Sequence, residues 1–137
     1  MKTALLIILL AVPALSLQGQ RITDNMNVHI ATIEADGRIR SARNMTLGHF
    51  MKDGSVRDAQ NRIVLRLGKN GRVYTSQNVL LGRIDDNGRV YDARNRLLGS
   101  VSADGRVTDS KNVLQAKGKG IRHDWLAVWW WWMKDSD

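Results

Sequence analysis

The sequence contains no cysteine and only one proline, Pro13, among its 137 residues. Without cysteine, neither a disulfide nor a thiolate metal site stabilises the fold, and a lipid-modified N-terminal cysteine is excluded as a membrane anchor. Aromatic residues are also few, with five Trp, two Tyr and one Phe, and the tryptophans gather at Trp125 and residues 129–132. A chain of this length suits one domain with a single modest core.

Residues 1–19 predict a secretory signal peptide. Lys2 supplies a positive charge, residues 4–12 are apolar, and Pro13 ends that stretch before small and polar residues. The apolar stretch is too short to span a bilayer as a helix, which takes about 20 residues. We expect cleavage after Ser16 or Gly19, with a buried N-terminal helix as the alternative. The expected location is therefore outside the cytoplasm: periplasmic, associated with the outer membrane, or extracellular.

A 17-residue repeat fills most of the remaining chain, over residues 20–120. Five regular units have glycine at position 2, Ile or Val at position 4 and asparagine at position 9. The marker glycines are Gly37, Gly54, Gly71, Gly88 and Gly105, and the asparagines are Asn44, Asn61, Asn78, Asn95 and Asn112. A degenerate copy precedes them, with Gln20 in place of the glycine. Five matches at one period establish an internal repeat.

Each unit predicts a β-hairpin. Two turn signals, an Asp/Asn-Gly pair and an Asn-containing polar run, alternate with short stretches rich in Val, Ile, Leu and Tyr. A three-residue loop ending at the marker glycine places an apolar residue opposite position 4 in every unit. The predicted pairs are Ile33 with Ile39, Phe50 with Val56, Leu67 with Val73, Ile84 with Val90, and Val101 with Val107. The Asn turn is compatible with a loop of three or four residues.

Single hairpins are marginal in water, so the repeats must pack against each other as a line or as a ring. A line leaves two open sheet edges, whereas a ring leaves none. We therefore predict an all-β fold of five to six hairpins, arranged radially with pseudo-five-fold symmetry like a propeller or flower. The residues at position 4 point to the axis, and residues 121–137 form an apolar, Trp-rich tail that packs on this domain.

The segment DNGRVYDARNRLLGSVSADGRV, residues 86–107, resembles the small exported β-flower proteins of Gram-negative bacteria. The predicted signal peptide and the aromatic C-terminal tail strengthen the resemblance, which extends over about residues 20–132. It implies hairpins radiating around a pseudo-symmetry axis, with five units corresponding to the five-fold type. The family carries no assigned activity, so the resemblance implies a fold and not a function.

The tail is eight apolar residues, 126–133, followed by four charged or polar ones. If it is a strand, Trp129 and Trp131 face one side while Trp130 and Trp132 face the other. The tail is then an extra strand or plug that closes the ring. The alternatives are a contact with a second copy of the chain and insertion at a membrane interface, where tryptophan is favoured. These four tryptophans are accordingly the candidate membrane or partner contacts.

Arginine occupies position 3 in all regular units except the one with Ser55, and position 3 lies beside the inward residue, so we expect these arginines on the opposite face as a basic collar. The collar consists of Arg38, Arg72, Arg89 and Arg106. Together with Tyr74 and Tyr91, it is the candidate binding surface for an acidic glycan or lipopolysaccharide. The alternative is a solvated face whose charges prevent edge pairing with other chains. Nucleic acid is not expected, because export separates the protein from it and the cations lack interleaved aromatics.

No catalytic, metal or cofactor site is predicted. The three histidines, His29, His49 and His123, are far apart in the sequence, and no serine lies in a nucleophile-elbow context. The repeated aspartates at position 6 suit turn capping better than acid/base catalysis. Two noncatalytic roles remain, a ligand-binding envelope module and a structural or assembly protein acting through its tail. A secreted hydrolase is the alternative that the sequence supports least.

Overall fold

The structure is a computed structural model that describes residues 20–135, so the predicted signal peptide and the last two residues lie outside the described part. Within these described residues, twelve strands are followed by one helical segment. The strands are β1 (Gln20–Asp24), β2 (His29–Ile33), β3 (Arg38–Ser41), β4 (Thr46–Phe50), β5 (Ser55–Asp58), β6 (Ile63–Leu67), β7 (Arg72–Thr75), β8 (Leu80–Ile84), β9 (Arg89–Asp92), β10 (Leu97–Val101), β11 (Arg106–Asp109) and β12 (Leu114–Lys117). The helical segment joins α2 (His123–Val128) to the π-helical η1 (Trp129–Met133), and we call it the tail helix.

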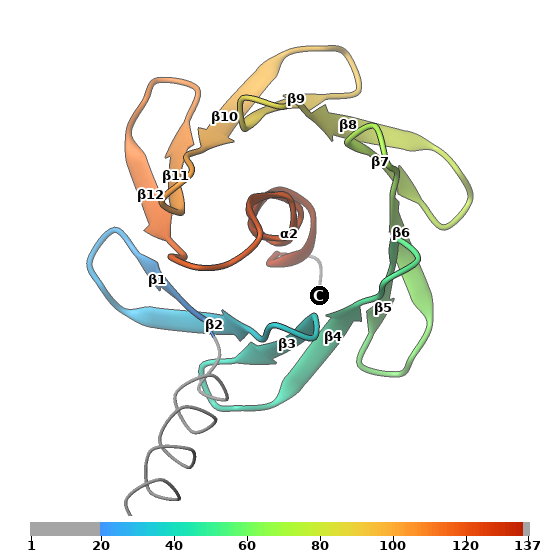
Figure 1. The fold of residues 1–137 in the computed structure, drawn as a ribbon, viewed down its shortest axis with the longest axis horizontal. Helices are drawn as coiled ribbons and strands as arrows, with labels where there is room; N and C mark the ends of the chain where they lie inside the picture. The colour runs from blue at the N-terminus through green and yellow to red at the C-terminus, as the bar shows by residue number, and fades with distance from the viewer. Residues whose placement is uncertain (1–19, 136–137) are drawn as a thin grey trace, which may run out of the picture.

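The strands form a closed antiparallel ring in which each strand pairs with its chain neighbours and β12 pairs with β1. Hairpins radiate outward from this ring, and α2 lies inside it (Figure 1). The degenerate copy takes a full place, because β1 and β2 form a hairpin like those of the regular units. The predicted all-β, radial hairpin architecture is therefore confirmed.

The turns at the marker glycines, here called Gly turns, have the predicted three-residue loop. In the first, the Gly37 N–H donates to the Glu34 carbonyl at 2.9 Å, and the Glu34 N–H donates to the Arg38 carbonyl at 2.9 Å. Gly37 has a φ of 96°, and a side chain there would overlap the Phe50 carbonyl oxygen. Only glycine enters this conformation without steric cost. All five predicted apolar pairs occur in the observed register.

The turns at the asparagines, here called Asn turns, also have three-residue loops, which settles the length that the sequence left open. The Asn44 N–H donates to the Ser41 carbonyl at 2.9 Å, and the Ser41 N–H donates to the Met45 carbonyl at 2.8 Å. The six turn asparagines have φ between 64° and 67°. Asparagine tolerates this left-handed conformation better than most other side chains, which explains why it recurs at position 9.

The core lies inside the ring and is shared between the strands and the tail helix. Every strand residue at position 4 is buried, as the fully covered Val73 and Val90 illustrate. The tail helix contributes the buried side chains of Leu126 and Val128. Trp125 stacks on Phe50 with the ring centroids 5.1 Å apart.

The Trp-rich tail is helical, so the alternating faces that a strand would give to its tryptophans do not form. The closed ring explains this result, since every strand already has two neighbours and no sheet edge remains for a further strand. A helix satisfies its own backbone hydrogen bonds and can fill the centre of the ring without a pairing partner.

Candidate functional site

The outward side chains of neighbouring strands form a basic surface around the ring, which we call the outer wall. Within each unit, the residue at position 3 pairs with the residue at position 14 on the adjacent strand. The residue at position 14 pairs in turn with the residue at position 5 of the following unit. Arg72 thus pairs with Arg83, which pairs with Tyr91. The other rows are Arg38–His49–Arg57, Ser55–Arg66–Tyr74, Arg89–Ser100–Thr108, Arg106–Lys117–Thr23 and Arg21–Thr32–Arg40.

No acidic residue occupies any of these outer-wall positions, because the acidic side chains of residues 20–135 lie in the turns, at the strand ends next to them, or in the tail. Two cations of the wall have acidic partners, Arg40 with Glu34 at 2.8 Å and Arg38 with Asp36 at 4.0 Å. Like charges that face each other across a strand pair repel. A bound anion would relieve this repulsion.

The sequence-predicted collar therefore divides into two parts. Arg38 is half-buried and reaches Asp36, whereas Arg72, Arg89 and Arg106 are exposed and have no acidic side chain within 4.0 Å among the described residues. The two tyrosines that were predicted with the collar, Tyr74 and Tyr91, are half-buried members of the same wall. The Arg83 guanidinium lies 4.1 Å from the centroid of the Tyr91 ring and donates to Asn95 Oδ1 at 2.7 Å.

The sequence missed the contribution of position 14, which supplies Arg66, Arg83 and Lys117 to the outer wall. Position 14 does not hold a fixed residue type, and in three of the hairpins it is His, Ser or Thr. The hairpin register could have identified these residues, since it places position 14 opposite position 3.

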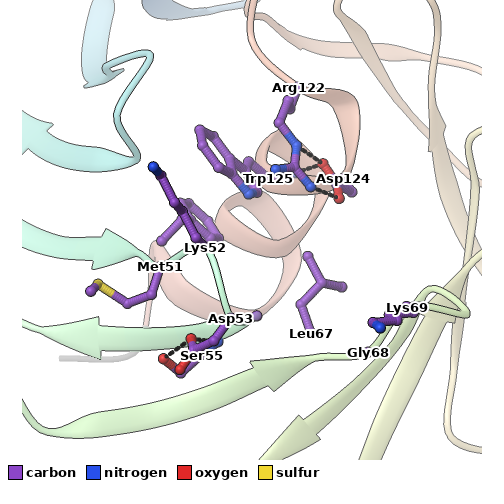
Figure 2. Close-up of a pocket in the computed structure, with 12 residues that line it drawn as sticks. Met51, Lys52, Asp53, Ser55, Leu67, Gly68, Lys69, Arg122, Asp124 and Trp125 are labelled. Atoms are coloured by element: carbon purple, nitrogen blue, oxygen red, sulfur yellow. Dashed lines mark hydrogen bonds and ion pairs between the residues drawn. The ribbon is translucent and has the colours of Figure 1, made fainter.

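A pocket of about 270 Å³ lies at the end of the ring that carries the Gly turns, between two of these turns and the start of α2. Figure 2 shows Arg122, Asp124 and Trp125 on the helix side, with Lys52 and Lys69 on the turns that line the same pocket. The Arg122 guanidinium donates to Asp124 Oδ2 at 2.7 Å, and it lies 4.4 Å from the centroid of the Trp125 ring. These contacts fix the entry of the chain into the centre of the ring.

The carboxylates near this pocket are held as hydrogen-bond acceptors. Ser55 donates to Asp53 Oδ1 from its hydroxyl at 2.7 Å and from its backbone N–H at 2.9 Å. These hydrogen bonds, the hydroxyl first, lower the pKa of Asp53. An acid with a lowered pKa is a poor proton donor near neutral pH. The arrangement suits structural capping of a turn.

The histidines lie in three separate places. His29 bonds the Thr32 hydroxyl at 2.9 Å, His49 bonds the Asp36 carbonyl at 3.0 Å, and His123 opens the tail helix. Within residues 20–135, no group of three or more His, Asp or Glu side chains is placed to hold a metal ion.

The tryptophans of the tail lie within or at the edge of the core. Trp129 is buried, while Trp130, Trp131 and Trp132 are half-buried and pack against the core. Two strand glycines at position 13 make room for them: a Cβ on Gly82 would lie 2.7 Å from Trp132, and one on Gly99 would lie 2.6 Å from Trp131. None of the helices in the described part of the chain is long and apolar enough to cross a membrane.

Comparison of the chain with curated proteins and with solved structures finds no match. Comparison with protein families finds one described as "5-fold beta-flower protein", which matches residues 18–134 and so covers the whole ring and the whole tail helix. The match agrees with the radial hairpins and with the resemblance of residues 86–107. The chain belongs to the 5-fold beta-flower protein family.

Proposed function

We propose that the protein is a noncatalytic, exported β-repeat module that binds an acidic polysaccharide of the cell envelope along its outer wall. One observation carries the proposal: neighbouring strands present arginines and lysines side by side, as Arg72–Arg83 and Arg106–Lys117, with no acidic residue among them. Such a surface concentrates anions, and a linear polyanion can contact several rows at once.

The side-chain chemistry favours a carboxylated or sulfated sugar chain. The planar guanidinium of arginine binds oxyanions with two parallel hydrogen bonds, which lysine cannot do. Tyr74 adds flat apolar surface beside Arg66, against which a sugar ring can pack, whereas the ring of Tyr91 already carries the Arg83 guanidinium. The predicted export signal favours an envelope glycan over a nucleic acid as the polyanion.

Binding of polygalacturonate and dextran sulfate to the purified protein tests the proposal, with neutral dextran as the control ligand. The triple variant Arg72→Ser/Arg89→Ser/Arg106→Ser removes three outer-wall cations that are exposed. Each lost charge-assisted hydrogen bond costs roughly 1.5–3 kcal/mol, so we expect an affinity loss of at least about tenfold and a shallower salt dependence.

The matched control is Arg43→Ser/Arg94→Ser/Lys111→Ser, which removes the same charge from exposed side chains of the Asn turns. It should bind the acidic polysaccharides nearly as well as the unmodified protein. Equal losses in the two triple variants would overturn the proposal, as would equal binding of neutral and acidic polymers.

A further inference from the structure

Large apolar side chains are exposed at one end of the ring only. Within residues 20–135 there are eight of them, and each lies within three residues of a turn asparagine: Met26, Val28, Met45, Leu47, Val79, Leu80, Leu97 and Val113. Met26 is 80% exposed and Met45 is 65% exposed. Single exposed apolar residues are normal on a soluble protein, but their concentration at one end is not.

The tail helix carries its tryptophans toward this same end. Its first residues, Asp124 and Trp125, line the pocket beside the Gly turns. Farther along, Trp131 and Trp132 approach Gly99 and Gly82. Those glycines lie at the middle of β10 and β8, four residues from the turn asparagines of their hairpins, so the helix advances from the Gly-turn end toward the Asn-turn end.

Half-buried apolar residues connect the tryptophans at the centre to the exposed tips. Residues at position 12 of four hairpins pack against the core at its Asn-turn side: Ile30, Val64, Leu81 and Leu98. Trp130, Trp131 and Trp132 are likewise half-buried and packed against the core. The Asn-turn end therefore presents apolar tips around a centre of partly exposed indoles, whereas the Gly-turn end presents charged side chains such as Lys52 and Asp86.

Cations lie among the apolar tips. Arg43, Arg94 and Lys111 are exposed in three of the Asn turns and have no acidic side chain within 4.0 Å among the described residues. The turn aspartates beside them are already occupied, as Asp92 is by the backbone N–H groups of Arg94 and Arg96. Two copies packed tip to tip would bring like charges together, whereas an anionic surface with an apolar interior complements both features.

We propose that the Asn-turn end docks on an anionic lipid bilayer. The methionine, valine and leucine tips enter the boundary between headgroups and acyl chains, and Arg43, Arg94 and Lys111 bind lipid phosphates. The indoles of Trp130, Trp131 and Trp132 lie at headgroup depth, where tryptophan is favoured. The outer wall then stands above the membrane, so this inference does not depend on polysaccharide binding.

Vesicle sedimentation tests the inference, using the purified protein and vesicles of phosphatidylcholine with and without one third phosphatidylglycerol. Tryptophan quenching by lipids brominated near the headgroup provides a second readout of the bound end. We expect binding that requires the anionic lipid, together with quenching of the tryptophan emission. No binding to either vesicle, or binding without quenching, would overturn the inference.

Two variants locate the contact. Met45→Ser/Val79→Ser/Val113→Ser changes exposed tips that do not fill the core, and it should weaken vesicle binding by at least about tenfold because three apolar contacts are lost. Lys52→Ser/Lys69→Ser changes the opposite end and should bind vesicles as the unmodified protein does.

The inference fails if the Lys52/Lys69 variant loses as much vesicle binding as the tip variant. It also fails if light scattering shows a stable dimer that dissociates when the tips are changed, since the tips would then cover a second copy. The tip variant should keep its affinity for acidic polysaccharide, which separates failure of membrane docking from failure of the proposed function.

Discussion

Two residue types give this chain its turns, and each is used at one kind of turn. Glycine takes the left-handed position of the Gly turns, with φ from 83° to 96° at the marker positions, and asparagine takes the same position in the Asn turns. Neither residue needs a ligand to explain its recurrence. The repeat consensus therefore records backbone geometry, and functional side chains must be sought at the variable positions.

Replacing Asn61 tests this interpretation. Asn61→Ala should destabilise the protein by about 1 kcal/mol, because alanine is sterically strained in the left-handed backbone conformation that asparagine tolerates. Asn61→Gly should be neutral or slightly stabilising, since glycine adopts that conformation freely. Urea unfolding monitored by tryptophan fluorescence measures both. A larger loss for Gly than for Ala would show that the Asn61 side chain has another role.

The turn aspartates predict an acid dependence of stability. Backbone N–H donation, from Arg62 to Asp58 and from Arg96 to Asp92, is the largest cause of a lowered pKa at both carboxyls. Because the folded pKa lies below the unfolded value of about 3.9, their contribution is complete above that pH. It is lost as the pH falls through the folded pKa.

The midpoint of urea unfolding should therefore fall as the pH is lowered below about 4. Asp58→Asn/Asp92→Asn should flatten this dependence, because the two titrating groups are removed. An unchanged slope in the double variant would mean that other carboxyls account for it.

At the scale of elements, the strands and their register follow from the sequence, but the tail helix does not. An apolar pair such as Ile33 and Ile39 fixes the register of a hairpin locally. Residues 126–133 are apolar throughout, and a uniformly apolar run has no period to distinguish helix from strand. Closure of the ring decides the outcome, and closure is a property of all the repeats together.

The candidate surfaces could be predicted only in part, because some of their residues are brought together by the pairing of strands and not by the local sequence. The collar arginines could be predicted because they alternate with a buried residue along one strand. The position-14 cations required the register between strands. Exposure of the tips, such as Met45, could not be read from the sequence because apolar residues beside a turn are equally compatible with burial.

The fit between ring and helix makes position 13 sensitive to side-chain size. Gly82→Ala and Gly99→Ala should each destabilise the protein by about 1–3 kcal/mol, because the added methyl group meets a carbonyl oxygen and an indole ring. Gly48→Ala is the matched control, since its methyl group meets backbone alone. Thermal unfolding should show a smaller loss for Gly48→Ala. Equal losses in all three would mean that the tryptophans do not set the requirement for glycine.

At the scale of the whole molecule, the tail helix is part of the core. Truncation after Gly120 removes the helix and exposes the inward side chains of the ring, such as Val73. We expect the truncated protein to lose its cooperative thermal transition and to bind a hydrophobic dye such as ANS, as loosely packed states do. Truncation after Met133 is the control and should preserve the transition. A cooperative transition after the longer deletion would show that the ring folds without its helix.

The central helix also limits how many repeats the protein can hold. Twelve strands spaced about 4.8 Å apart close a circle about 18 Å across before strand tilt is considered, and a helix with its side chains measures about 10–12 Å. A linear repeat protein can gain or lose units freely, because each unit contacts only its neighbours. Here one added 17-residue unit would widen the circle by two strands and would separate the inward face of the strands from the indoles of the tail helix. The diameter of the helix therefore limits the number of hairpin repeats in the ring. Duplication of a hairpin requires a compensating change in the tail.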